Sequence, residues 1–100
     1  MSSAMDELED RVRRQLNRIR DLGDQMTAVR ARETSPDGEV TVVVDGNGAL
    51  CDLEFSEGIS RLSPQDFGQL VVTTAARAAQ RAFAERGDLV TAFNEEMAGR

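Results

Sequence analysis

The stretch SPDGEVTVVVDGNGALCDLEF, residues 35–55, decides the fold of this chain. It opens with SPDG at 35–38, whose Pro, Asp and Gly are typical of a tight turn. The β-branched run at 40–44 predicts a strand over 39–45, and the residues DGNG at 45–48 tolerate the positive φ angles of a hairpin turn. Alternation of apolar and polar residues resumes at 49–55 and predicts the second strand of a β-hairpin.

The two sides of the second strand differ in chemistry. Cys51, Leu53 and Phe55 share one side, which we expect to be buried, and Asp52 and Glu54 share the other. Cys51 lies among apolar neighbours, so we expect a core residue rather than a nucleophile. The two acids could chelate a cation, but a solvent-facing side explains them without any chemistry. The DGNG segment is likewise interpreted as a turn, because it lacks the further acids of a calcium loop and does not open onto a helix.

Upstream of this hairpin the sequence predicts a helix over residues 4–28 and a short edge strand over 29–34. The apolar residues of the helix follow the 3-4 spacing of a coiled-coil seam, which Gln15 interrupts. Such a narrow seam suggests a partner helix from a second copy, although a helix lying on its own domain would explain it too. We expect a homodimer interface that includes, on this helix, Leu8, Val12, Leu16, Ile19, Leu22 and Met26.

Downstream, Ser63 and Pro64 are typical of a helix start and predict a helix over residues 64–86. This helix is rich in alanine, which permits close approach to a sheet or another helix, and we expect it to add Val71, Ala75 and Ala78 to the dimer interface. Arg86-Gly87-Asp88 resembles a helix end followed by a new cap, so residues 88–98 are predicted to form a tail, a short separate helix or a continuation after a bend. The fold class is therefore α+β, with the element order α-β-β-β-α in a single domain of residues 1–100.

Composition excludes several classes of function. The 100 residues contain no histidine and one cysteine, which excludes an intrachain disulfide, a Cys/His zinc site and any His-based catalytic triad. With no nucleophile, base or metal set in sight, we expect no enzyme, no cofactor, no metal and no small-molecule substrate. The sequence shows no membrane span, and its start carries acids where a signal peptide would be basic and then apolar, so we expect a cytoplasmic protein.

Charge is unevenly distributed along the chain. The net charge is −6, and residues 33–66 hold eight of the eighteen acids but only one arginine. All twelve basic residues are arginines, a bias that GC-rich coding explains as readily as function. Such a chain is repelled by DNA on average, so DNA binding would require its positive groups to be concentrated on one face.

The order of these segments resembles a known family. A heptad helix is followed by the SPDG turn, the valine strand, the glycine hairpin, the acidic-apolar strand and, after Leu62-Ser63-Pro64, an alanine-rich helix. Over roughly residues 5–85 this order is similar to that of the YbaB/EbfC family of small bacterial nucleoid-associated proteins, especially its actinobacterial members. The resemblance implies an intertwined, tweezer-shaped homodimer that binds duplex DNA through its protruding helices, and a protein located in the cytoplasm on the nucleoid.

The resemblance transfers no fixed motif, so the candidate DNA contacts are the arginines of the two helices. They are Arg11, Arg13, Arg14, Arg18 and Arg20 on the first helix and, more weakly, Arg77 and Arg81 on the second. Acids four residues before Arg11, Arg13 and Arg14 are placed for ion pairs along the helix, which leaves Arg18 and Arg20 the freest. Lacking aromatic wedges, the protein is expected to recognise the DNA backbone and shape rather than base edges.

A protein-binding adaptor is the alternative function. YbaB-like proteins also occur in actinobacterial gene clusters for specialised secretion, and the resemblance therefore also implies an adaptor or a chaperone-like partner. An acidic sheet, a coiled-coil helix and an alanine-rich groove suit a protein ligand as well as they suit self-association.

Overall fold

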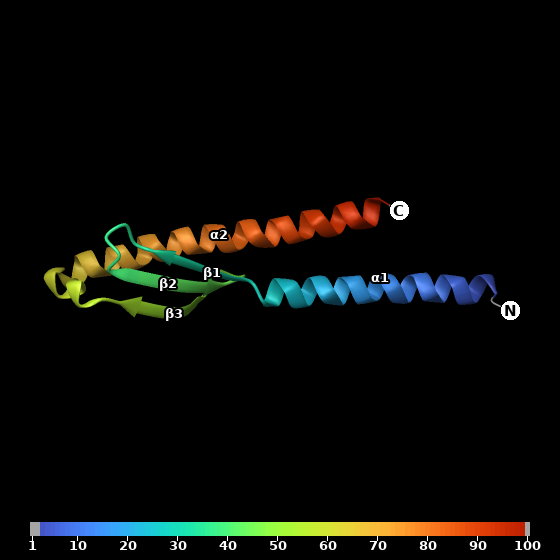
Figure 1. Cartoon of the computed structure of the whole chain (residues 1–100), viewed down its shortest axis with the longest axis horizontal. Coiled ribbons are helices and arrows are strands. Elements are labelled where there is room, and N and C mark those ends of the chain that lie inside the picture. The colour runs from blue at the N-terminus through green and yellow to red at the C-terminus, as the bar shows by residue number, and fades with distance from the viewer. Residues whose placement is uncertain (1–2, 100) are drawn as a thin grey trace.

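The computed structural model describes residues 3–99 as two long helices joined by a three-stranded sheet (Figure 1). The elements are α1 (Ala4–Thr27), β1 (Arg30–Thr34), β2 (Val40–Asp45), β3 (Leu50–Phe55), the 3-10 helix η1 (Glu57–Arg61) and α2 (Pro64–Ala98). The sheet is antiparallel with the order β1-β2-β3. The predicted α+β class and α-β-β-β-α order are confirmed.

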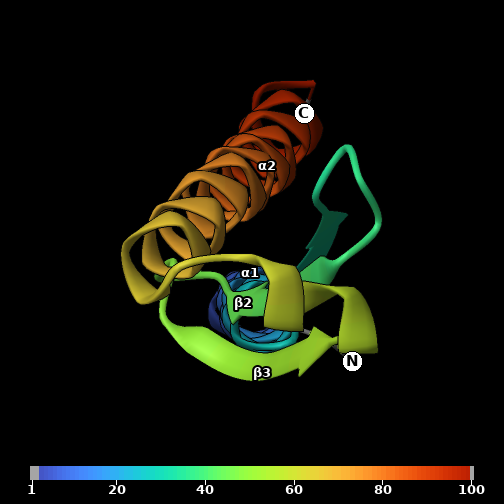
Figure 2. The ribbon, with the colours of Figure 1, turned by 90° about the vertical axis from the view of Figure 1, so that its left-hand side faces the viewer.

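The molecule is elongated. Its extents are 75 × 19 × 16 Å and its radius of gyration is 20.7 Å, whereas a compact domain of this length has a radius of about 13 Å. In Figure 1 the sheet occupies one end, and α1 and the second half of α2 extend from it in the same direction as two prongs. Figure 2, viewed along the long axis, shows α2 on one side of the sheet and α1 behind the sheet.

The core lies between the sheet and the middle of α2. Val40, Val42 and Val44 of β2 are fully buried, because alternate residues of a strand face the same side and α2 covers that side. Ala78 and Ala82 of α2 are also fully buried in this cluster. Their small side chains let the helix backbone approach the valines closely. In contrast, α1 contributes no buried residue.

The second half of α2 differs from the prediction. A helix end or a bend at residues 86–88 was expected, followed by a tail, a short separate helix or a continuation over 88–98. Instead, the helix runs without interruption to Ala98. The Arg86 guanidinium donates to the carbonyl oxygen of Gly46 at 2.9 Å, and Leu89 packs against the core cluster. Because tertiary contacts hold the chain on both sides of Gly87, they offset the roughly 1 kcal/mol by which glycine weakens a helix.

Cys51 is exposed, so the prediction that it lies in the core is wrong. The ladder between β2 and β3 is irregular: Asp52 is opposite Val43, but Leu50 is opposite Val44. This β-bulge leaves Cys51 as the extra residue and disturbs the alternation on which the prediction relied. Phe55 is also exposed, because α2 lies chiefly over β1 and β2 and leaves β3 at the less covered edge.

Local contacts explain where the helices begin and how the hairpin turns. Ser3 and Asp6 form a reciprocal capping box at the start of α1. The Ser63 hydroxyl accepts from the Asp66 amide at 3.0 Å at the start of α2, as the sequence predicted. Gly48 has a φ of 80°, and a Cβ there would lie 2.9 Å from Cζ of Phe83, so both conformation and space require glycine.

Candidate nucleic-acid interface

The five candidate arginines of α1 lie on two flanks of the helix. Spacings of three and four residues place Arg11, Arg14 and Arg18 on the flank toward α2. Together with Gln15 and Met97 of α2 they line an open cavity of about 260 Å³. We call these three arginines the inner row, because they face the space between the two prongs.

Arg13 and Arg20 lie on the other flank. They border an open hollow of about 570 Å³ together with apolar residues of the helix stripe, among them Val12 and Leu16. Seven residues separate the two arginines, which is two helical turns, so they lie on one line along the helix. We call them the outer pair. The apolar stripe runs between the inner row and the outer pair.

Arg18 is not as free as the sequence indicated. Its Nη1 forms an ion pair with Oε1 of Glu96, near the end of α2, and the two side chains are 35% and 46% exposed. Within residues 3–99, none of the three expected pairs along α1, from Glu7 to Arg11, Glu9 to Arg13 and Asp10 to Arg14, is close enough for an ion pair. The charges of Arg11 and Arg14 therefore remain available on the inner row.

Arg77 and Arg81 lie away from the α1 arginines and attach α2 to the sheet. Arg81 donates to the carbonyl oxygen of Arg32 and pairs with Glu33, both at 2.7 Å. Arg77 donates to the carbonyl oxygen of Thr34 at 3.3 Å and is half-buried. Both side chains thus have a structural role on β1, and the structure does not bring them to the space between the prongs.

The apolar stripe of α1 is uncovered in this chain. Leu8, Val12, Leu16 and Ile19 are each about half exposed, while Leu22 and Met26 near the sheet are partly buried. Large exposed apolar surfaces are typical of sites that pack against a partner.

The three residues of α2 that were expected in that interface lie on its side toward the sheet. Ala78 is fully buried in the core of its own chain and cannot reach a partner, and Val71 and Ala75 pack against the same core. The sequence of α2 is rich in alanine and did not show which side of the helix faces the sheet. The exposed face instead carries Phe83 and Val90, which line an open hollow together with Met26 of α1. The apolar stripe therefore continues from α1 onto α2.

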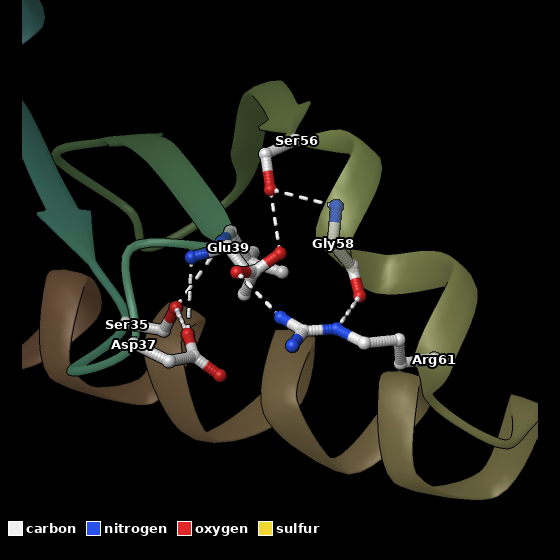
Figure 3. Close-up of polar contacts among 7 residues, drawn as sticks. Ser35, Asp37, Glu39, Ser56, Gly58 and Arg61 are labelled. Atoms are coloured by element: carbon white, nitrogen blue, oxygen red, sulfur yellow. Dashed lines mark hydrogen bonds and ion pairs between the residues drawn. The ribbon is translucent and has the colours of Figure 1, made fainter.

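A cluster of polar side chains joins the turn between β1 and β2 to η1 (Figure 3). The Glu39 carboxylate accepts from the Ser56 hydroxyl at 2.5 Å and pairs with Arg61 at 3.4 Å. In the turn itself, hydrogen bonds from the Ser35 hydroxyl and the Glu39 amide hold the pKa of Asp37 below its ordinary value. Because internal partners occupy these groups, the cluster serves the fold.

Metal binding, membrane insertion and the DGNG turn are the other features of the chain that bear on its function. Within the described range 3–99, no three metal-ligating side chains gather, and no helix is long and apolar enough to cross a membrane. Asp45 accepts from the Ala49 and Asn47 amides in the hairpin turn, and these bonds lower its pKa. The turn is therefore closed by its own backbone, in agreement with the turn interpretation of DGNG.

The comparison with protein families decides the identity. The model of the YbaB/EbfC DNA-binding family matches residues 1–97. The chain belongs to the YbaB/EbfC DNA-binding family. This family is DNA-binding, nucleoid-associated and non-enzymatic, so the resemblance to the YbaB/EbfC family found in the sequence is confirmed.

A solved structure shows the same fold. The chain is similar to the uncharacterized protein HP0035 from Helicobacter pylori, with a TM-score of 0.65 and 14% sequence identity. The likeness covers 91% of this YbaB/EbfC chain and 96% of the other. Among curated proteins, none matches the sequence.

Proposed function

We propose that the protein binds duplex DNA as a homodimer in the cytoplasm, on the nucleoid, and that the inner row of arginines on α1 contacts the phosphate backbone. The observation that carries this proposal is the position of Arg11, Arg14 and Arg18. Three guanidinium groups line one open cavity on a protruding helix of a chain from a DNA-binding family. Guanidinium groups match phosphate oxygens in geometry as well as in charge.

Part of the net charge of −6, which counts against DNA binding, lies away from the prongs. Eight acids lie between residues 33 and 66, that is, in the sheet, its turns, η1 and the first turn of α2. The inner row lies on α1, toward the far end of α2. Since exposed charges further apart than about 8–10 Å are largely screened at physiological salt, the acids of the sheet act weakly on DNA held at the prongs.

The uncovered apolar stripe supports self-association. Isolated helices in water are marginal, and most of their stability in proteins comes from packing of an apolar face. The 24 residues of α1 have no buried side chain within one chain. A second copy is the occupant that fits, because the 3-4 spacing of the stripe suits helix-to-helix packing and a two-fold axis pairs the same patch with itself.

Sequence preference is expected to be weak. Residues 1–100 contain no Trp or Tyr, and the proposed contacts are guanidinium groups, which bind phosphate oxygens strongly. Contacts of this kind position a protein on the duplex without reading its sequence. Competition between unrelated duplexes of equal length should therefore show similar affinities.

Two measurements test the proposal. Light scattering should give twice the protomer mass of 10.9 kDa at micromolar concentration. Fluorescence anisotropy with a labelled duplex should show binding that weakens steeply as salt rises, because phosphate contacts release counterions. A mass of one protomer contradicts the dimer. Failure to bind duplex DNA at low salt contradicts the DNA-binding function.

A further inference from the structure

The end of α2 places a carboxylate against the inner row of arginines. Glu96 is paired with Arg18, and Met97, the next residue, lines the same cavity as Arg11 and Arg14. The pair also borders a second hollow of about 290 Å³, which Leu22 of α1 and Phe93 of α2 help to line. Glu96 is thus the acid of α2 that meets the proposed DNA surface.

We propose that Glu96 acts as an internal competitor for phosphate, so that it sets the affinity and the salt dependence of DNA binding. This inference rests on the proposed function. A carboxylate and a phosphate accept hydrogen bonds from the same edges of a guanidinium group. Arg18 must therefore give up Glu96 before it can make a full contact with the DNA backbone.

The exposure of the pair makes this exchange feasible. Its side chains are 35% and 46% exposed, so water and salt reach both partners and the pair is weak enough to open. Arg11 and Arg14 have no such carboxylate partner within residues 3–99. They can meet phosphates first, and Arg18 joins them when the DNA phosphate replaces Glu96.

Glu95 offers a matched control. It is exposed and has the same charge, but it lies about 100° further round the helix than Glu96 and forms no ion pair in residues 3–99. Glu95→Gln and Glu96→Gln change the net charge of the full chain equally. A difference between them therefore reports the position of the carboxylate and not the total charge.

The experiment is anisotropy with one labelled duplex over a series of salt concentrations, using the full-length wild type and both variants. We expect Glu96→Gln to raise affinity by roughly 2- to 5-fold, the range for an exposed ion pair, and clearly more than Glu95→Gln does. The slope of log affinity against log salt should become steeper by up to about 0.9 per protomer. In this variant Arg18 can neutralise a phosphate without first giving up a carboxylate, and each neutralised phosphate releases counterions from the DNA. In an Arg18→Ala background, the advantage of Glu96→Gln over Glu95→Gln should disappear.

The possible failures are distinguishable. If the wild type binds DNA and the two Gln variants have equal affinities, the competitor role is wrong and the proposed function stands. An advantage of Glu96→Gln that survives in the Arg18→Ala background also overturns the inference, since Glu96 would then act without Arg18. If neither the wild type nor Glu96→Gln binds duplex DNA at low salt, both the function and the inference are wrong.

Discussion

Arg86 of α2 donates a hydrogen bond from Nη1 to the carbonyl oxygen of Gly46, at 2.9 Å. Gly46 is buried in the turn between β2 and β3, and the same nitrogen lies 3.3 Å from Oδ1 of Asn47. The contact therefore joins the second half of the long helix to the hairpin, at the place where the sequence alone suggested that the helix ends or bends.

Arg86→Ala should destabilise the protein, because it leaves the buried Gly46 carbonyl without its guanidinium partner. The expected loss is about 1–3 kcal/mol in the free energy of unfolding, measured with urea. Arg20→Ala removes an arginine of the exposed outer pair and serves as the control, with little expected change. Equal stability of the two variants would show that Arg86 does not hold the helix to the turn.

Gly58→Ala should also destabilise the fold. A Cβ at this position would overlap the Glu39 carboxylate, which would have to move away from Ser56 and Arg61 (Figure 3). We expect a loss of about 1–2 kcal/mol from this network.

Gly68→Ala is the matched control for Gly58→Ala. It lies inside α2, and an added Cβ would meet no neighbouring side chain, so alanine should raise stability by about 0.4–1 kcal/mol. Opposite signs of the two changes in unfolding free energy are the expected result. A stabilising Gly58→Ala would mean that the Glu39 cluster contributes nothing.

Ile19→Asp tests the apolar stripe of α1. Ile19 is half exposed in one chain, so a monomer should tolerate the aspartate, whereas in a dimer it buries a charge without a partner. Light scattering over a dilution series should show dissociation, since each buried unpaired charge costs about 3–5 kcal/mol. Asn17→Asp adds the same charge on the opposite side of the helix and should leave the mass unchanged. A dimeric Ile19→Asp protein with unchanged melting would place the interface elsewhere.

Acid should weaken the fold through Asp37 and Asp45. Hydrogen bonds lower the pKa of both carboxyls below the ordinary value of 3.8. Their stabilisation is therefore complete above that value and is lost as the pH falls through the lowered pKa of the folded state. The difference in unfolding free energy between wild type and Asp37→Asn/Asp45→Asn should shrink between about pH 5 and about pH 2. A difference that stays constant over this range would contradict the shifts.

The sequence predicted the elements well because their signals are local. The turn residues at 35–38 and 45–48, the caps at Ser63 and Pro64 and the spacing of the first helix each depend on near neighbours. The helix end or bend predicted at Gly87 was wrong because distant parts of the chain keep the helix intact there. Arg86 contacts Gly46, and Leu89 packs against the core.

The candidate site was less predictable. The sequence found the arginines of α1 but could not tell the inner row from the outer pair, because that division depends on where α2 passes. For the same reason it missed Phe83 and Val90 as exposed residues and could not show Glu96 next to Arg18. The 3-4 spacing defines the faces of a helix, and only the tertiary arrangement assigns each face to a neighbour.

The salt dependence of DNA affinity tests the central claim most directly, when it is measured for the wild type and two double variants. Arg11→Ala/Arg14→Ala removes two arginines of the inner row, and Arg13→Ala/Arg20→Ala removes the outer pair with the same change in net charge. The inner variant should flatten the slope of log affinity against log salt by up to about two units per protomer, while the outer variant should change it much less. Equal slopes for the two variants, or a larger effect of the outer one, would contradict DNA binding through the inner row.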